Sequence, residues 1–167
     1  MAEGRASLLE RLFPRQVDNG FDGHRSALWL LGLLVALKLV VALNSIFNTQ
    51  AVAAGADGIP LDSFAPAAAR EVLTLFALTA LGQLVLALIA LAALVRWRAL
   101  VPFLYLVSLA ELIARRLIVE SNDLTRAASS PVAWYVTWGV MGLVTLGLAL
   151  SLLPRRAAGR QPPSSRT

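Results

Sequence analysis

Hydrophobic positions in this chain gather into four long runs with short polar segments between them. Each run is about 20 residues or a little more, and a helix of that length, at roughly 1.5 Å per residue, crosses a hydrocarbon core of about 30 Å. The runs occupy positions 26–45, 72–95, 99–119 and 133–153. The pattern therefore predicts an all-α fold: an integral membrane four-helix bundle.

The composition agrees with a membrane location. The chain has 167 residues, of which 57% are hydrophobic and 15% charged, and its mean hydropathy is +0.69. A water-soluble domain of this size could not bury so much apolar surface. The net charge of +5 comes from basic residues in tails and loops beside the runs, where anionic lipid headgroups are a nearer partner than nucleic acid. We expect headgroup contacts at the arginines that flank the inner ends of the runs, Arg96, Arg98, Arg155 and Arg156.

The distribution of arginines predicts the orientation. Four precede the first run, two lie between the second and third, and four follow the last: Arg5, Arg11, Arg15 and Arg25; Arg96 and Arg98; Arg155, Arg156, Arg160 and Arg166. The other two loops each contain one arginine, outnumbered by acidic residues. Because positive charge is retained in the cytoplasm, both termini are expected inside. Only one of the 15 basic residues is lysine, and alanine and leucine dominate, which suggests a GC-rich bacterial source and hence the bacterial cytoplasmic (inner) membrane.

The segments outside the runs carry weaker signals. In the cytoplasmic segment 1–25, Ser7 and Glu10 match a capping box. A short helix there would place Leu8, Leu9, Leu12 and Phe13 on one face against the inner membrane surface, with Arg11 and Arg15 towards headgroups; a frayed tail is the alternative. The segment 154–167 is basic and rich in Pro and Ser, and is expected to be disordered.

The connections between the runs predict their geometry. Glycine, aspartate and proline in the long 46–70 connection indicate turns rather than strands. Pro66 suits the first turn of a helix that continues into the second run. Arg96-Trp97-Arg98 makes so tight a turn that the second and third helices are expected to be adjacent and antiparallel. At the outer end of the fourth run an aromatic belt is expected from Trp134, Tyr135 and Trp138.

Charged residues inside the runs are the strongest functional signals. A charge at the bilayer centre costs about 2.5–3.5 kcal/mol even on the milder insertion scales. Lys38 lies about seven residues before the outer end of the first run, and Glu111 about eight before the outer end of the third. Because both helices run outward, these depths match within about one residue rise. The sequence predicts an ion pair between them.

Further polar residues extend this into a candidate intramembrane cluster of Lys38, Gln83, Ser108, Glu111 and Arg115. Arg115 follows Glu111 by four positions, in the order that favours pairing, and Ser108 shares the same helix face. Gln83 lies near the middle of the second run, where an amide typically hydrogen-bonds across helices. One interpretation is a brace that fixes helix packing. The other is a polar site in which Glu111 binds a cation or proton and Arg115 an anion.

The sequence offers little for catalysis. There is no cysteine and one histidine, His24, which lies outside the runs. Serine-hydrolase and phosphate-loop motifs are absent, and Glu111 is the only carboxylate at depth. We therefore expect no catalytic residue, cofactor or metal site. The favoured function is a non-enzymatic accessory or interaction subunit, as a homo-oligomer or with another membrane protein. The alternative is a small transporter or channel component that uses Lys38, Glu111 and Arg115.

Overall fold

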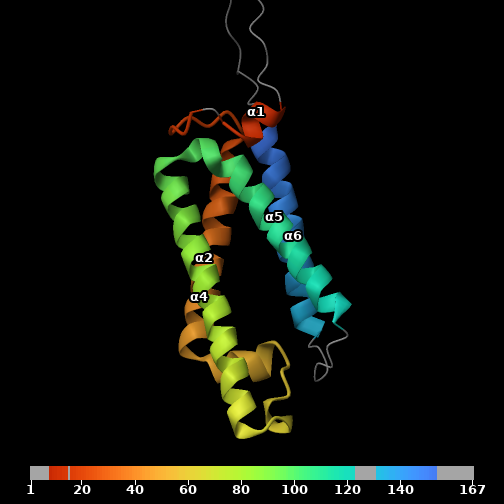
Figure 1. Ribbon diagram of the computed structural model, residues 1–167. Coiled ribbons are helices and arrows are strands. Elements are labelled where there is room, and N and C mark those ends of the chain that lie inside the picture. Colours follow the sequence, from red (N-terminus) through yellow and green to blue (C-terminus); the bar gives the residue numbers. More distant parts are fainter. Residues whose placement is uncertain (1–7, 15, 123–130, 154–167) are drawn as a thin grey trace, which may run out of the picture.

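The computed structural model describes residues 8–14, 16–122 and 131–153, and this part of the chain contains helices and loops but no strand. The main helices are α1 (Leu8–Leu12), α2 (Arg25–Phe47), α3 (Thr49–Ala51), α4 (Pro66–Arg96), α5 (Val101–Ser121) and α6 (Pro131–Leu152) (Figure 1). Shorter turns are the π-helical Val52–Ala56 and the 3-10 turns Leu61–Ser63 and Arg98–Leu100. The predicted all-α class is confirmed.

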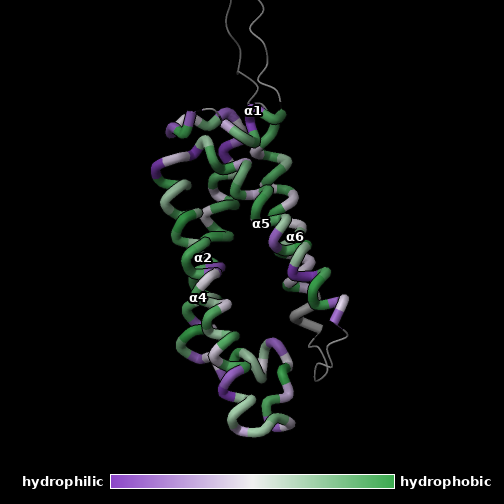
Figure 2. Tube along the Cα trace, in the orientation of Figure 1, coloured by the Kyte–Doolittle hydropathy of each residue, from purple (hydrophilic) through white to green (hydrophobic). Residues whose placement is uncertain are grey.

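Three helices are long and apolar enough to cross a membrane: α2, α4 and the part of α6 from Tyr135 to Leu152. Apolar residues predominate along them in Figure 2. Three such helices support a membrane location for the protein. The helix of the third run, α5, differs because its second half carries four charged residues, Glu111, Arg115, Arg116 and Glu120.

The helices form two pairs that meet at one end. Helix α4 packs along α2, and α5 packs along α6; α2 and α6 join the pairs. The pairs converge at the top of Figure 1 and spread apart towards the bottom. The expectation that α4 and α5 would be adjacent is therefore met only in part. The tight turn at Trp97 brings their ends together, and beyond it each helix packs mainly on a different partner, with the hydrogen bond between Gln83 and Glu111 as a direct contact between them.

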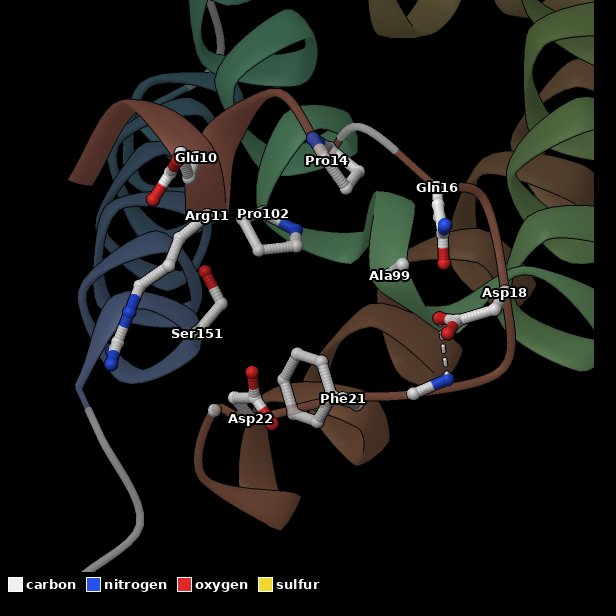
Figure 3. A pocket seen from close by; sticks show the side chains of 12 residues that line it. Glu10, Arg11, Pro14, Gln16, Asp18, Phe21, Asp22, Ala99, Pro102 and Ser151 are labelled. Atoms are coloured by element: carbon white, nitrogen blue, oxygen red, sulfur yellow. Dashed lines mark hydrogen bonds between the residues drawn. The ribbon is translucent and has the colours of Figure 1, made fainter. Parts of the chain in front are cut away.

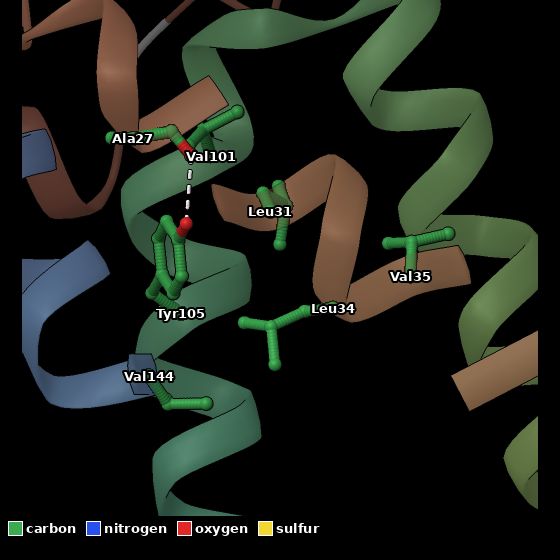
Figure 4. Packing of buried hydrophobic residues seen from close by; sticks show 7 residues of the cluster. All are labelled: Ala27, Leu31, Leu34, Val35, Val101, Tyr105 and Val144. Atoms are coloured by element: carbon green, nitrogen blue, oxygen red, sulfur yellow. Dashed lines mark hydrogen bonds between the residues drawn. The ribbon is translucent and has the colours of Figure 1, made fainter. Parts of the chain in front are cut away.

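The apolar core lies where the pairs converge. Seven buried residues form it: Ala27, Leu31, Leu34, Val35, Val101, Tyr105 and Val144 (Figure 4). Tyr105 of α5 is fully buried, and its hydroxyl donates a 2.7 Å hydrogen bond to the Ala27 carbonyl of α2. Its ring occupies the space that a side chain at position 147 would need, so Gly147 allows α5 to approach α6 closely.

The connection from α2 to α4 contains no strand, as expected, and consists largely of the short helix α3, the π-helical Val52–Ala56 and the 3-10 turn Leu61–Ser63. Asn48 is the C-cap residue of α2. Gly58 adopts a φ of 66°, which glycine tolerates without strain. Pro66 occupies the first turn of α4, as predicted, and α4 begins six residues before the apolar run that it contains.

The N-terminal segment crosses the end of the bundle. Arg11 donates a 2.7 Å hydrogen bond to the carbonyl of Leu152, the last residue of α6, and the rings of Phe13 and Phe103 lie 5.6 Å apart. The expectation that Arg11 would face headgroups is wrong, because it binds a carbonyl at the negative end of a helix instead. Leu8 and Leu9 of α1 remain exposed.

Some expectations fall outside the described residues. These are the capping serine Ser7, Arg15, the side chain of Trp134, and the tail 154–167 with Arg155 and Arg156. Within the described part, Tyr135 and Trp138 of the expected aromatic belt are exposed.

Candidate functional site

A closed triangle of polar side chains joins three helices at mid-length. Lys38 of α2 donates from Nζ to Oε2 of Glu111 at 2.7 Å and to Oε1 of Gln83 at 3.1 Å. Gln83 of α4 donates from Nε2 to Oε1 of Glu111 of α5 at 2.8 Å. Each member of this polar triangle thus bonds the other two, and the ion pair predicted between Lys38 and Glu111 is present.

Helix register brings these residues to one depth. Lys38 lies thirteen residues after the start of α2, and Gln83 lies thirteen before the end of the antiparallel α4. Glu111 lies ten residues before the end of α5, and Lys38 nine before the end of α2. Because every residue adds the same rise, the three side chains meet with little adjustment.

Arg115 adds a second cation beside the carboxylate. Its Nη2 donates to Oε1 of Glu111 at 3.1 Å, one helical turn along α5. The neighbouring Arg116 instead pairs with Glu120, at 2.6 Å. Two cations, Lys38 and Arg115, therefore face the single carboxylate of Glu111. The three side chains are 25%, 52% and 23% exposed respectively, so the cluster is not sealed from its surroundings.

Other residues considered from the sequence do not join the cluster. Ser108 is half-buried on α5, and no hydrogen bond links it to the polar triangle among the described residues. The hydroxyl of Thr79 donates to the carbonyl of Leu75 in its own helix. Asn44 accepts a hydrogen bond from the side chain of Asn48. Of the predicted set, the structure brings together Lys38, Gln83, Glu111 and Arg115.

The geometry limits what the cluster can do. Glu111 accepts from Lys38 and Gln83 across helices and from Arg115 within its own. The Lys38 ammonium lies where a cation bound to this carboxylate would lie. No group of three metal-type ligands occurs in the described ranges. The arrangement ties α2 and α4 to α5 beyond the point where their apolar core ends.

A second feature is an open pocket of about 510 Å³ under the N-terminal segment (Figure 3). Glu10, Asp18 and Asp22 lie at its wall, opposite the ends of α5 and α6. Asp18 already accepts a hydrogen bond from the Gly20 amide at 2.9 Å. Sequence reasoning missed this pocket because it forms only when the N-terminal segment folds over the bundle.

Sequence reasoning also missed the hydrogen bond of Tyr105, although a signal was available. A tyrosine inside an apolar run needs a partner for its hydroxyl when it is buried. A glycine at the same depth of the neighbouring helix, here Gly147, indicates where such a ring fits.

Comparison with known proteins adds nothing to this geometry: no family model, no curated protein and no solved structure matches the chain.

Proposed function

We propose that this chain is a four-span protein of the bacterial cytoplasmic membrane, with both termini inside, that acts as a non-enzymatic accessory subunit by binding a second membrane protein. The observation that carries the proposal is how little apolar surface the chain covers by itself. Only 28%, 17% and 17% of the most apolar stretches of α2, α4 and α6 are buried. Lipid and a partner helix are the two environments that accept such surfaces.

The charged half of α5 is compatible with a fourth span. Glu111 pairs with Lys38, and Arg116 with Glu120, so most of its charge is paired at short distance. Its 21 residues correspond to about 32 Å of helix, enough to cross a hydrocarbon core. Lys and Arg side chains near a helix end also reach outward to the interface.

The polar triangle supports a structural role for the cluster. Its residues satisfy one another across α2, α4 and α5. Such a network resembles a brace more than a reaction centre, which would present an unengaged nucleophile or base. The brace holds the two helix pairs in a defined arrangement and so presents a fixed outer surface to a partner.

The exposed face of α6 is the surface we assign to that partner. Gly139, Gly142, Thr145 and Ala149 follow one another at helical spacing, and all are exposed. A side chain added at either glycine would meet nothing within 4 Å. Small residues let helix backbones approach closely in membranes. Gly147 lies on the opposite side of α6, against Tyr105.

The test is purification of the full chain in mild detergent, with bound membrane proteins quantified by mass spectrometry. A partner at fixed stoichiometry is expected, either a second copy or another membrane protein. Gly142→Leu should lower its retention at least about fivefold, since one lost packing contact of about 1 kcal/mol has that effect. Gly82→Leu on α4, which is equally open, is the matched control and should retain the partner. A monomer without any stoichiometric partner contradicts the proposal.

The topology has an independent test. The chain contains no cysteine, so single cysteines can be labelled without background. Asp57→Cys, in the connection after α2, should react with a membrane-impermeant maleimide added to cells whose outer membrane has been made permeable and whose cytoplasmic membrane is intact. Arg98→Cys, in the turn before α5, should react only after the membrane is opened. Equal labelling of both contradicts the orientation.

A second candidate is transport, favoured by one observation. Lys38 and Glu111 are each about a quarter exposed, so a small solute or ion could reach them. Flux in proteoliposomes that is lost in Glu111→Gln and kept in Glu120→Gln would favour this function. Against transport, the Glu111 carboxylate already accepts hydrogen bonds from Lys38 and Arg115.

A further inference from the structure

The cluster at the polar triangle carries an excess of positive charge. Lys38 and Arg115 contribute two cations and Glu111 one anion, while Glu120 balances Arg116. Within the part of the chain that the structure describes, neither Lys38 nor Arg115 has a second carboxylate at ion-pair distance. An unbalanced charge inside a bilayer is costly, so a counter-charge supplied from outside the chain would stabilise the cluster.

Arg115 holds its charge near the depth of Glu111 instead of extending it towards the outer surface. Its Nη2 atom reaches back by one helical turn to Oε1 of Glu111, at 3.1 Å. A guanidinium has five N–H donors, and among the described residues this is the only hydrogen bond that Arg115 makes. The side chain is 52% exposed, so a group outside the bundle can reach the remaining donors. Lipid headgroups lie nearer the surface, so another helix is the natural carrier of an acceptor at this depth.

The face of α5 around Arg115 is open to such a helix. Ala114, Arg115, Ile118 and Ser121 fall on one stripe at helical spacing, and all four are exposed. In Figure 1 this half of α5 lies at the end where the two helix pairs spread apart. The small side chains of Ala114 and Ser121 let a second helix approach closely. A helix packed there contacts Ile118 and can place one of its own side chains beside Arg115.

Charge selects the kind of partner. A second copy of this chain brings the same two cations and one carboxylate, so a homodimer would double the excess instead of cancelling it. A helix with one Asp or Glu at this depth cancels the excess, and its carboxylate matches the planar fork of N–H donors that an arginine presents.

We propose that this face of α5 binds a transmembrane helix of a different protein, whose Asp or Glu carboxylate accepts hydrogen bonds from Arg115. This charged contact adds to the close contact assigned to α6, and it narrows the partner to a protein with an acidic residue inside the membrane. It depends on the four-span topology and on the accessory role proposed above.

The test measures binding of synthetic transmembrane peptides to the full chain in phosphatidylcholine vesicles. The peptides are leucine-rich helices of about 20 residues with one Asp or one Asn at the centre; this position matches Glu111, which lies ten residues before the end of α5. Binding is followed by energy transfer from a labelled peptide to a fluorophore on Asp57→Cys, the only cysteine of that variant. The chain with Arg115 should bind the Asp peptide about tenfold more tightly than the Asn peptide, the effect of about 1.4 kcal/mol.

Variants of α5 identify the residue responsible. Arg115→Gln should reduce the preference for the Asp peptide to less than about twofold, and Arg115→Lys, which keeps the charge, should retain most of it. Arg116→Gln is the matched control: it removes the same charge from the next residue, whose partner is Glu120, and should leave the preference unchanged. Because Arg115 also binds Glu111, the thermal midpoint of each variant is measured to verify folding.

Several outcomes would overturn the proposal. Equal binding of the Asp and Asn peptides is one, and equal losses in Arg115→Gln and Arg116→Gln are another. Loss of the Asp preference when phosphatidylglycerol replaces part of the phosphatidylcholine would assign the position to an anionic lipid. Energy transfer between two labelled copies of the chain that Arg115→Gln removes would assign it to a homodimer.

The accessory role fails separately from this assignment. Peptide preference in a chain that co-purifies with no stoichiometric protein would contradict only the accessory role. A co-purified protein that is sensitive to Gly142→Leu, together with equal binding of both peptides, would contradict only the acidic partner on α5. The cysteine labelling described above decides the topology without any peptide.

Discussion

The ion pair between Lys38 and Glu111 makes an asymmetric prediction. In Glu111→Gln, Lys38 keeps only the neutral Gln83 as a partner. In Lys38→Met, Glu111 keeps both Gln83 and Arg115. Removing one partner of a fully buried pair costs about 3–5 kcal/mol, because the other charge is left without compensation. The charge of Lys38 in Glu111→Gln is therefore less well compensated than the charge of Glu111 in Lys38→Met.

The magnitudes follow from exposure and the remaining contacts. Both side chains are about a quarter exposed, which lowers the cost of Glu111→Gln to about 2–4 kcal/mol. Lys38→Met should cost about 1–2 kcal/mol, since Arg115 still neutralises the carboxylate. The double variant strands neither charge of the pair and should cost about 1–2 kcal/mol. The coupling energy is then about 2–4 kcal/mol in favour of the pair.

The assay is reversible unfolding in mixed dodecyl sulfate and dodecyl maltoside micelles, followed by the fluorescence of the four tryptophans. A coupling within about 0.5 kcal/mol of zero would refute the reasoning, since independent sites add to within that margin. A charge swap of Lys38 and Glu111 is a poorer test, because it places a lysine one turn from Arg115. The swapped chain should therefore recover only part of the stability.

Three further predictions concern contacts near the end where the bundle converges. Gly147→Ala should lower the unfolding free energy by about 1–3 kcal/mol, because the new methyl group overlaps the Tyr105 ring. Tyr105→Phe should lower it by about 1–2 kcal/mol, since the buried Ala27 carbonyl loses its 2.7 Å partner. Arg11→Ala should cost about 1 kcal/mol by removing the contact with the Leu152 carbonyl, and limited proteolysis should then cut the N-terminal segment faster.

Each of these has a matched comparison. Gly142→Ala adds the same methyl group to an open position of α6 and should leave stability unchanged or slightly higher. Thr79→Val removes a hydroxyl that bonds to a carbonyl of its own helix at an exposed position and should change stability by less than about 0.5 kcal/mol. Arg98→Ala, at an exposed arginine, should leave proteolysis of the N-terminal segment unchanged. If a control variant and its counterpart behave alike, the contact named for that counterpart does not stabilise the fold.

The sequence predicted the depth of polar groups well, because depth follows from counting residues along a helix. The ion pair between Lys38 and Glu111 could be predicted on that basis alone. Gln83 was expected to bond across helices, and the same count along the antiparallel α4 places it level with Lys38. What counting does not provide is the rotation of each helix. Ser108 shares a face of α5 with Glu111, yet no hydrogen bond joins it to the polar triangle.

Pairing of the helices was harder to predict, because a tight turn constrains only the two ends that it joins. The expected contact of α4 with α5 depends on side chains far from Trp97. Tyr105 packs against Gly147 and draws α5 to α6, and no charge marks either residue within its apolar run. The position of Arg11 was unpredictable for a related reason. Its partner is a backbone carbonyl 141 residues away, and such a partner has no sequence signature.

That separation has a consequence for biosynthesis. The chain is made from its N-terminus, so Arg11 leaves the ribosome long before Leu152 exists. The N-terminal segment can contact α5 through Phe13 once that helix has been made, but it can bind the end of α6 only after the last helix exists. Complete docking therefore requires the whole bundle, and a nascent chain arrested before α6 should leave this segment more open to a protease.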